Sequence, residues 1–267
     1  QDDGLDVALR EPVGVCGLIV PWNFPLLITT WKVAPALTCG NPVVVKPASL
    51  TPITALMLAD VLLDAGVPPA CVSVLPGPGS TLGNRLVADA RVNKISFTGD
   101  SSTGAQIMRT CADNITRVSL ELGGKSACIV FDDADLEAAI AATPMSVFDN
   151  TGQDCCARSR FIVHRSVYDD FVAGFVAGTQ RLVVGDPLDE ATQLGPMISE
   201  GQRRTSLEYL EVASAEGARR LCGGDATGPG WYLSPAVLAD VDNSMRVAQE
   251  EIFGPVASII PFDDEAD

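Results

Sequence analysis

Short apolar runs alternate with polar turns and with segments of helical spacing throughout the first half of the chain. The runs predict strands at 13–20, 41–45, 72–75, 94–97 and 117–122, with helices between them at 26–37, 51–65, 82–90 and 104–111. Most of these strands are followed by a turn rich in Gly or Pro and then by a helix. This repeat predicts an α/β protein with a doubly wound, Rossmann-like parallel sheet.

The second half of the chain continues the α/β pattern. It predicts strands at 127–131, 161–164 and 256–262, and helices at 132–147, 168–182 and 200–216. Gly123-Gly124 comes closest to a domain boundary, because no low-complexity linker occurs anywhere else. We therefore expect two α/β domains that meet near this pair.

Composition narrows the range of functions. Hydrophobic residues make up 47% of the 267 residues, which is typical of a globular protein, and the net charge is −16. A surface this acidic repels phosphate backbones and disfavours nucleic acid as a partner. No apolar run approaches the roughly 18 residues that a membrane span requires, so no membrane association is expected.

The number and spacing of the cysteines and histidines argue against a metal site. Eight cysteines show no Cys-x-x-Cys spacing, and His164, the single histidine, fits a surface position at a strand end. We therefore predict no metal, and we interpret most cysteines as reduced core residues of a cytoplasmic protein. A general base, if one is needed, should be a carboxylate or a lysine.

The most unusual stretch is the polar loop 148–160, which joins a helical segment to a strand. It contains the adjacent pair Cys155-Cys156, shortly after Gly152. A partly exposed cysteine in such a loop is a candidate nucleophile, because the thiolate attacks electrophiles. The alternative is that both cysteines are small buried hydrophobic residues.

Other candidates lie at strand ends, where parallel α/β sheets bind ligands. Asn23, between two prolines, could donate its amide to an oxyanion, and Glu121, with apolar neighbours, suits a general base. Lys46 could bind a ribose hydroxyl or a phosphate, and the glycine turns 99–104 and 77–83 could bind an anion. Alternatively, these residues are a turn asparagine, an outward-facing strand residue, a solvated lysine and ordinary turns.

Six motifs together resemble the aldehyde dehydrogenase superfamily, in its order and approximate spacing over nearly the whole chain. They are Pro21-Trp22-Asn23-Phe24-Pro25, Lys46-Pro47-Ala48-Ser49, Phe97-Thr98-Gly99, Glu121-Leu122-Gly123-Gly124-Lys125-Ser126, Gly152-Gln153-Asp154-Cys155 and Glu250-Glu251-Ile252-Phe253-Gly254-Pro255-Val256. Within the superfamily, the chain looks most like the class that includes betaine and amino-aldehyde enzymes.

The resemblance implies a division into domains. Residues 1–10 would be a strand from an oligomerisation segment, 11–124 part of a dinucleotide-binding domain, and 125–267 part of a catalytic domain. It further implies an internal fragment of a homo-oligomer, dimeric or tetrameric. Such a fragment should expose apolar faces and fold weakly or aggregate when isolated.

The resemblance also implies NAD- or NADP-dependent oxidation of a small-molecule aldehyde to a carboxylate. Cys155 would form a thiohemiacetal and then a thioester, and Asn23 together with the Cys155 N–H would hold the oxyanion. Glu121 would activate the hydrolytic water, Lys32 would contribute positioning and proton relay, and Cys156 would be a spectator. The alternatives are a CoA-acylating semialdehyde dehydrogenase and a structural protein on the same scaffold, as some crystallins are.

The implied cofactor contacts include two departures from the family pattern. Ser49 stands where enzymes that prefer NAD often have Glu, which leaves NADP possible. Asp100 stands where a serine often meets the pyrophosphate, so we expect its carboxylate to turn away or the phosphate to sit differently. The full set of implied contacts is Pro21, Trp22, Lys46, Ser49, Gly99, Asp100, Ser101, Gly104, Gly123, Glu251 and Phe253.

Overall fold

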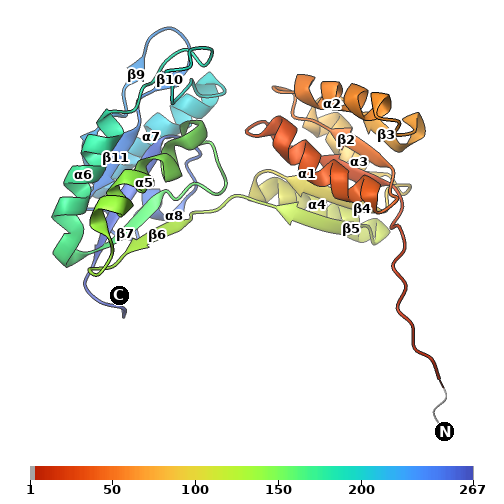
Figure 1. Ribbon diagram of the computed structural model, residues 1–267, viewed down its shortest axis with the longest axis horizontal. Helices are drawn as coiled ribbons and strands as arrows, with labels where there is room; N and C mark the ends of the chain where they lie inside the picture. The colour runs from red at the N-terminus through yellow and green to blue at the C-terminus, as the bar shows by residue number, and fades with distance from the viewer. Residues whose placement is uncertain (1–3, 267) are drawn as a thin grey trace. The chain divides into compact units, whose positions relative to one another are not determined.

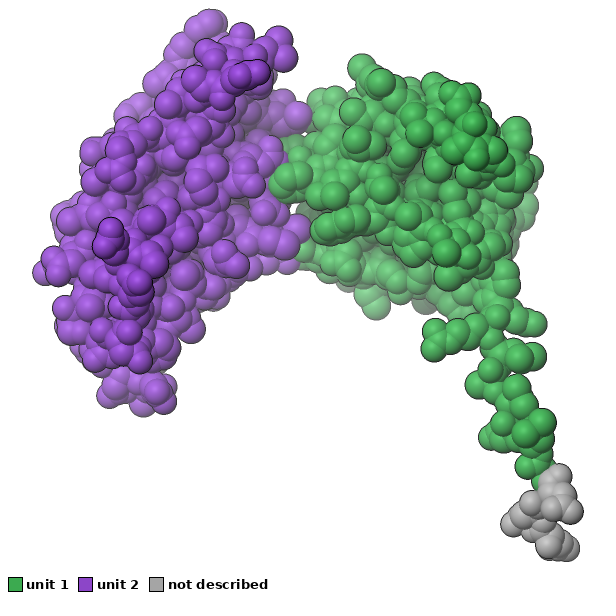
Figure 2. Space-filling view, viewed as in Figure 1, with its two compact units in different colours: residues 1–122 green, residues 123–267 purple. Residues whose placement is uncertain are grey.

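The chain divides into two compact units, Gln1–Leu122 and Gly123–Asp267, which Figure 2 colours separately. The structure is a computed structural model that describes residues 4–266. Each unit builds its own sheet and its own cores.

The first unit is built on a parallel sheet, sheet A, in the order β3-β2-β1-β4-β5. Because β1 is central and the chain winds outward to both sides, this order confirms the doubly wound sheet predicted from the sequence. The strands are β1 (Cys16–Ile19), β2 (Val43–Lys46), β3 (Val72–Val74), β4 (Lys94–Thr98) and β5 (Arg117–Glu121).

Helices cover both faces of sheet A (Figure 1). α1 and α2 pack on one face, over a core that includes Val43 and Val45, while α3 and α4 pack on the other, over Ile95 and Phe97. Central strands buried on both faces explain the continuous Val-Val-Val run in β2. The helices are α1 (Pro25–Thr38), α2 (Ile53–Asp64), α3 (Asn84–Ala88) and α4 (Ser101–Asn114).

The second unit is built on a mixed sheet, sheet B, in the order β6-β7-β12-β11-β8. β8 runs antiparallel to β11, whereas the other neighbours are parallel. Sequence reasoning missed β8 because an edge strand with the sequence Arg-Arg-Leu-Cys lacks an apolar run. The strands are β6 (Ala127–Val130), β7 (Arg160–His164), β8 (Arg219–Cys222), β11 (Ala236–Ala239) and β12 (Val256–Phe262).

Sheet B is also covered on both faces. α5 and α6 bury a cluster of phenylalanines that includes Phe148, Phe161 and Phe175, and α7 and α8 close the other face through Leu210 and Val247. The helices are α5 (Leu136–Phe148), α6 (Tyr168–Gln180), α7 (Glu200–Glu216) and α8 (Arg246–Gln249). A separate antiparallel pair joins β9 (Ala226–Thr227) to β10 (Tyr232–Leu233).

The strand expected at 1–10 is not formed in residues 4–10, and residues 1–3 lie outside the described part. Leu5 and Leu9, which suggested a strand, are 90% and 80% exposed. A strand requires a neighbour to accept and donate its backbone hydrogen bonds, and this segment lies outside the strands that pair in sheets A and B. Separately, no helix within residues 4–266 is both long enough and apolar enough to span a bilayer.

Candidate active site

In the first unit, the predicted polar residues gather along one edge of sheet A. Lys46 and Glu121 are the last residues of β2 and β5, Asn23 follows β1, and Gly99 follows β4. Because these strands are parallel, their carboxyl ends share that edge. Further along it, the Gly99 N–H donates a hydrogen bond of 3.1 Å to the Glu121 carbonyl.

Lys32 projects from α1 into a buried position against β4. Its Nζ donates a hydrogen bond of 2.8 Å to the Ser96 hydroxyl. Burial lowers the pKa of Lys32 to about 8; the charge of Glu121 acts in the opposite direction, and that of Lys94 adds to the lowering. An ammonium with this pKa can release and recover a proton near neutral pH, which suits the proton relay implied by the resemblance.

Lys46 lies beside one of the two glycine turns found in the sequence. Its side chain is buried, and burial lowers its pKa. A Cβ added at Gly79 would lie 3.9 Å from the Lys46 Nζ, and one at Gly83 would lie 4.0 Å from its Cδ. Next to this turn, the Ser49 hydroxyl donates a hydrogen bond of 3.1 Å to the Gly77 carbonyl. Glycines here therefore leave room around the lysine for a ligand.

The second glycine turn, residues 99–104, contains a carboxylate, that of Asp100, at the start of α4. Asp100 caps α4: its carboxylate accepts hydrogen bonds from the Thr103 N–H (2.9 Å), the Thr103 hydroxyl (2.7 Å) and the Ser102 hydroxyl (2.6 Å). Burial alone would raise the Asp100 pKa, but these hydrogen bonds lower it overall. The carboxylate thus takes up donors of the first turn of α4, which begins at Ser101.

One close contact and one exposed side chain complete this edge of the first unit. Gly104 allows α4 to approach closely, because a Cβ there would come 2.6 Å from the Leu122 side chain. Glu121 was expected among apolar neighbours, but it is exposed, because β5 is the outermost strand of sheet A. Its suitability as a base therefore cannot rest on burial.

The loop that carries Cys155 has an unusual backbone. Asn150, Thr151 and Gly152 have φ values of 50°, 58° and 69°, all in the left-handed region. For a β-branched residue such as Thr151, this conformation is strained and persists only where the surroundings impose it. A Cβ at Gly152 would lie 2.2 Å from the carbonyl oxygen of Gly254, so the loop presses directly on the backbone that leads into β12.

Side-chain amides hold this loop in place. The Gln153 carbonyl oxygen Oε1 accepts a hydrogen bond of 2.9 Å from the Ile198 N–H, and its Nε2 donates one of 3.1 Å to the Asn150 carbonyl. In return, the Asn150 amide donates one of 3.2 Å to the Gln153 carbonyl. The Thr151 hydroxyl donates a hydrogen bond of 3.0 Å to the Gly195 carbonyl. The segment before Cys155 is therefore rigidly positioned.

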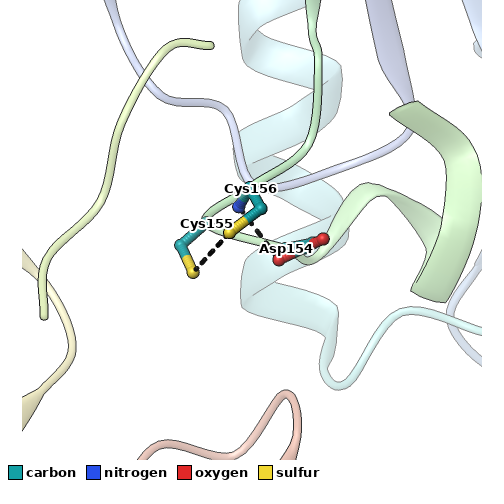
Figure 3. A group of neighbouring side chains, drawn as sticks. All are labelled: Asp154, Cys155 and Cys156. Carbon is teal, nitrogen blue, oxygen red and sulfur yellow. Dashed lines mark hydrogen bonds between the residues drawn. The ribbon is translucent and has the colours of Figure 1, made fainter. Parts of the chain in front are cut away.

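The nucleophile candidate has a sulfur and a carboxylate as neighbours (Figure 3). The Sγ atoms of Cys155 and Cys156 are 3.9 Å apart, and Asp154 accepts a hydrogen bond of 2.9 Å from the Cys156 N–H. Burial, followed by the neighbouring Cys156 and Asp154, raises the pKa of Cys155 to about 12. The thiol is therefore protonated at neutral pH in this unit, and its reaction requires a group that accepts the proton.

Two other predicted site residues of the second unit, Gly123 and Glu251, lie near the Cys155 loop. The Gly124 N–H donates a hydrogen bond of 3.2 Å to Glu251, and a Cβ at Gly123 would lie 1.9 Å from a Glu251 oxygen. A Cβ at Gly124 would lie 3.6 Å from the Cys155 carbonyl. Gly123, Cys155 and Glu251 thus meet where the chain enters β6, β7 and β12, which is the amino edge of sheet B. The candidates of the first unit line a carboxyl edge.

The segment after Glu251 is fixed from α7. The Gln202 side chain donates hydrogen bonds of 3.0 Å and 2.9 Å to the carbonyls of Ile252 and Phe253. Phe253 itself has a left-handed φ of 57°. Sequence reasoning missed Gln202, because nothing in the helical pattern around it distinguishes it from a surface residue.

A second residue missed by sequence reasoning is Lys125, although it lies inside a quoted motif. Its Nζ is buried without a hydrogen-bond partner among the residues that the structure describes. Burial, helped by nearby Arg160, lowers the Lys125 pKa to about 8, while Glu251 and Glu250 act in the opposite direction. Lys125 therefore places a weakly held proton next to the Glu251 contact.

Comparison with known proteins identifies relatives over almost the whole chain. The model of the "Aldehyde dehydrogenase family" matches residues 1–267. Retinal dehydrogenase 2 of Mus musculus is 47% identical over 255 residues, which is 95% of this chain and 49% of the relative. Aldehyde dehydrogenase, cytosolic 1, of the same species is 46% identical over 255 residues, which is 95% of this chain and 51% of the relative. The chain thus spans about half the length of these relatives.

Solved structures give the same result for the fold. An indole-3-acetaldehyde dehydrogenase in complex with NAD+ has a TM-score of 0.95 at 42% identity, covering 96% of this chain and 53% of that one. An aldehyde dehydrogenase of Mycobacterium tuberculosis, also with NAD+, has a TM-score of 0.94 at 46% identity, covering 97% and 54%. The betaine and amino-aldehyde class suggested by the sequence is not confirmed by these comparisons.

Proposed function

Because this chain belongs to the aldehyde dehydrogenase family, we propose that the protein oxidises an aldehyde to a carboxylate with NAD or NADP, using Cys155 as the nucleophile. The observation that carries the proposal is the loop 150–155. Its left-handed backbone and amide clamp fix the main chain at Cys155, whose carbonyl lies beside Gly124, and Gly124 in turn hydrogen-bonds to Glu251. Such strain is typical of functional sites.

In the proposed first step, the sulfur of Cys155 bonds to the aldehyde carbon, and the thiol proton leaves for a base. The carbonyl oxygen becomes an oxyanion, which the Asn23 amide and the Cys155 N–H would stabilise by hydrogen bonding. Asn23 belongs to the other unit, so this joint action is part of the proposal. The product of the step is a thiohemiacetal on Cys155.

The residues present fit a dinucleotide. Gly79 and Gly83 leave space beside the Lys46 ammonium for ribose or phosphate oxygens, and Gly123 leaves space for Glu251, a carboxylate suited to ribose hydroxyls. We propose Pro21, Trp22, Ser49, Gly99, Asp100, Ser101, Gly104 and Phe253 as further contacts. When bound, NAD or NADP would supply the acceptor for one hydride from the carbon attached to Cys155.

In the proposed last step, Glu121 takes a proton from water, and the resulting hydroxide attacks the thioester carbon. The carbon–sulfur bond breaks, the carboxylic acid leaves, and the Cys155 thiolate takes back the proton that the base removed in the first step. Exposure of Glu121 gives its carboxylate direct access to water. Lys32, with its pKa lowered to about 8, would carry protons onward from Glu121.

The comparisons lend no support to a CoA-acylating enzyme or to a structural protein. A cytosolic location is part of the proposal and rests on the name of one relative. A dimeric or tetrameric assembly is part of it as well, and light scattering would measure it.

The reaction class can be tested directly on the protein expressed with its complete natural sequence. The panel should include retinal, indole-3-acetaldehyde, octanal and betaine aldehyde, each with NAD and with NADP. We expect one nicotinamide reduced for each carboxylate formed, with no requirement for coenzyme A. Reduction that requires coenzyme A, or no turnover of any aldehyde, would contradict the proposal.

We expect Asp100→Asn to bind NAD more tightly than the parent protein. Asparagine keeps an oxygen that caps α4 but removes a negative charge from the helix start. The gain should be about 0.5–1 kcal/mol, or roughly two- to fivefold in Kd. Quenching of tryptophan fluorescence by NAD would measure it. Asp113→Asn, near the other end of the same helix, is the matched control, and an equal change in both variants would refute the role of Asp100.

A further inference from the structure

We propose that Asp154, Cys155 and Cys156 form a binding site for one thiophilic divalent cation of the Zn²⁺ type, and that its occupation blocks the Cys155 sulfur. One oxygen of Asp154 and the two sulfurs lie within 4.8 Å of one another. Figure 3 shows the three side chains on a single turn of the loop. The site overlaps the proposed nucleophile, but cation binding itself does not depend on the proposed reaction.

The spacing of the sulfurs matches what tetrahedral zinc requires. Two Zn–S bonds of about 2.3 Å at the tetrahedral angle place the sulfurs roughly 3.8 Å apart. The Sγ atoms of Cys155 and Cys156 are 3.9 Å apart. A cation could therefore bridge them with little movement of either side chain. A carboxylate oxygen from Asp154 would be the third ligand, and water would complete the tetrahedron.

The surrounding structure makes the loop a rigid platform for these ligands. The hydrogen bond from the Cys156 N–H to Asp154 orients the carboxylate beside the sulfurs. The clamp between Asn150 and Gln153 fixes the backbone immediately before them. Ligands that are already held near their bound positions lose little freedom on binding, which favours affinity.

Electrostatics favours a cation at the same place. The Asp154 carboxylate lies beside the two sulfurs. A divalent cation would supply positive charge among these ligands, and a thiol that coordinates it loses its proton. Binding would form two Zn–S bonds and one Zn–O bond and release two protons to solvent. The net charge of −16 adds a long-range attraction for cations.

This inference revises the expectation of no metal, which rested on scarce histidine and on the absence of Cys-x-x-Cys. Those spacings describe structural zinc sites with four protein ligands. Three adjacent ligands instead leave an open position and suit a reversible, inhibitory site. Occupation would draw electron density from the Cys155 sulfur and obstruct its approach to a carbonyl, so the sulfur would attack far more slowly.

The test is a Zn²⁺ titration of the whole protein against a chromophoric chelator, without substrate or cofactor. We expect one Zn²⁺ per chain and release of two protons. Cys155→Ser and Cys156→Ser should each weaken binding at least about tenfold, because each removes a direct ligand. Cys39→Ser, an exposed cysteine at the end of α1, is the matched control and should bind as the parent does.

A second arm follows aldehyde oxidation with and without Zn²⁺, each variant normalised to its own zinc-free rate. We expect EDTA-reversible inhibition of the parent and of Cys39→Ser, and at least about tenfold less sensitivity in Cys156→Ser. Equal Zn²⁺ affinity in Cys156→Ser and the parent would overturn the site, as would failure of the parent to bind. Since the first arm uses no aldehyde, failure of the proposed reaction would be seen separately.

Discussion

Cys155→Ser is expected to lower kcat for aldehyde oxidation by roughly 10³–10⁶-fold, since it removes the atom that forms the covalent intermediate. A serine hydroxyl in the same loop has a much higher pKa than a thiol and is far less nucleophilic. The measurement is nicotinamide reduction at saturating aldehyde, supported by a search for the acyl adduct by mass spectrometry. NAD affinity should stay within about twofold, since the cofactor contacts proposed here come from other residues.

Two cysteines provide controls for this loss. Cys156→Ser tests whether the neighbouring thiol of the loop is needed as well, and Cys39→Ser tests a distant exposed thiol. If Cys155→Ser retained a tenth or more of the parental rate, or if Cys156→Ser lost as much as Cys155→Ser, the assignment of the nucleophile would be wrong. A loss confined to Cys155→Ser would support it.

The raised pKa of Cys155, about 12, also sets the pH dependence of its alkylation. Below that pKa the thiolate fraction rises about tenfold per pH unit, so alkylation by iodoacetamide should accelerate steadily from pH 6 to 9. Labelling of Cys155, followed by mass spectrometry in the Cys156→Ser background, measures this directly. A plateau near neutral pH would show that the whole protein supplies a stabilising charge that the loop itself lacks.

The fold could be predicted to the extent that local pattern determines it. Buried parallel strands such as β2 produce apolar runs that are visible without any structure, and turns rich in Gly and Pro separate the elements. β8 lacked such a run because an edge strand buries only part of its surface. The segment 4–10 showed alternation but forms no strand, because pairing depends on a neighbour that the local sequence does not reveal.

The candidate site was predicted residue by residue, whereas its geometry was not. Motifs identified Cys155, Gly123 and Glu251 separately, but their meeting at the amino edge of sheet B depends on contacts more than a hundred residues apart along the chain. The raised pKa of Cys155 and the Lys125 amine, which lacks a hydrogen-bond partner within residues 4–266, both arise from burial, which only the packed structure specifies.

The second large effect is expected for Gly152→Ala, which should destabilise the second unit by roughly 2–6 kcal/mol, the sum of left-handed strain and overpacking. A Cβ at this position would lie 2.2 Å from the Gly254 carbonyl oxygen and 2.8 Å from the Pro255 nitrogen. Both are backbone atoms next to β12, so neither can move aside as a flexible side chain would. Urea unfolding followed by circular dichroism measures the loss.

Gly217→Ala separates the two causes of that loss. Gly217 ends α7 in the same unit with a left-handed φ of 100°, but a Cβ there would meet nothing within 4 Å. It should therefore cost only about 1 kcal/mol, the ordinary penalty for alanine in this conformation. If both variants lost the same stability, contact with the Gly254 backbone would not be what holds the loop. If Gly152→Ala lost more stability than Gly217→Ala, and if Cys155 were also alkylated faster in it, the hydrogen bonds of Asn150 and Gln153 would be limiting the exposure of the Cys155 sulfur.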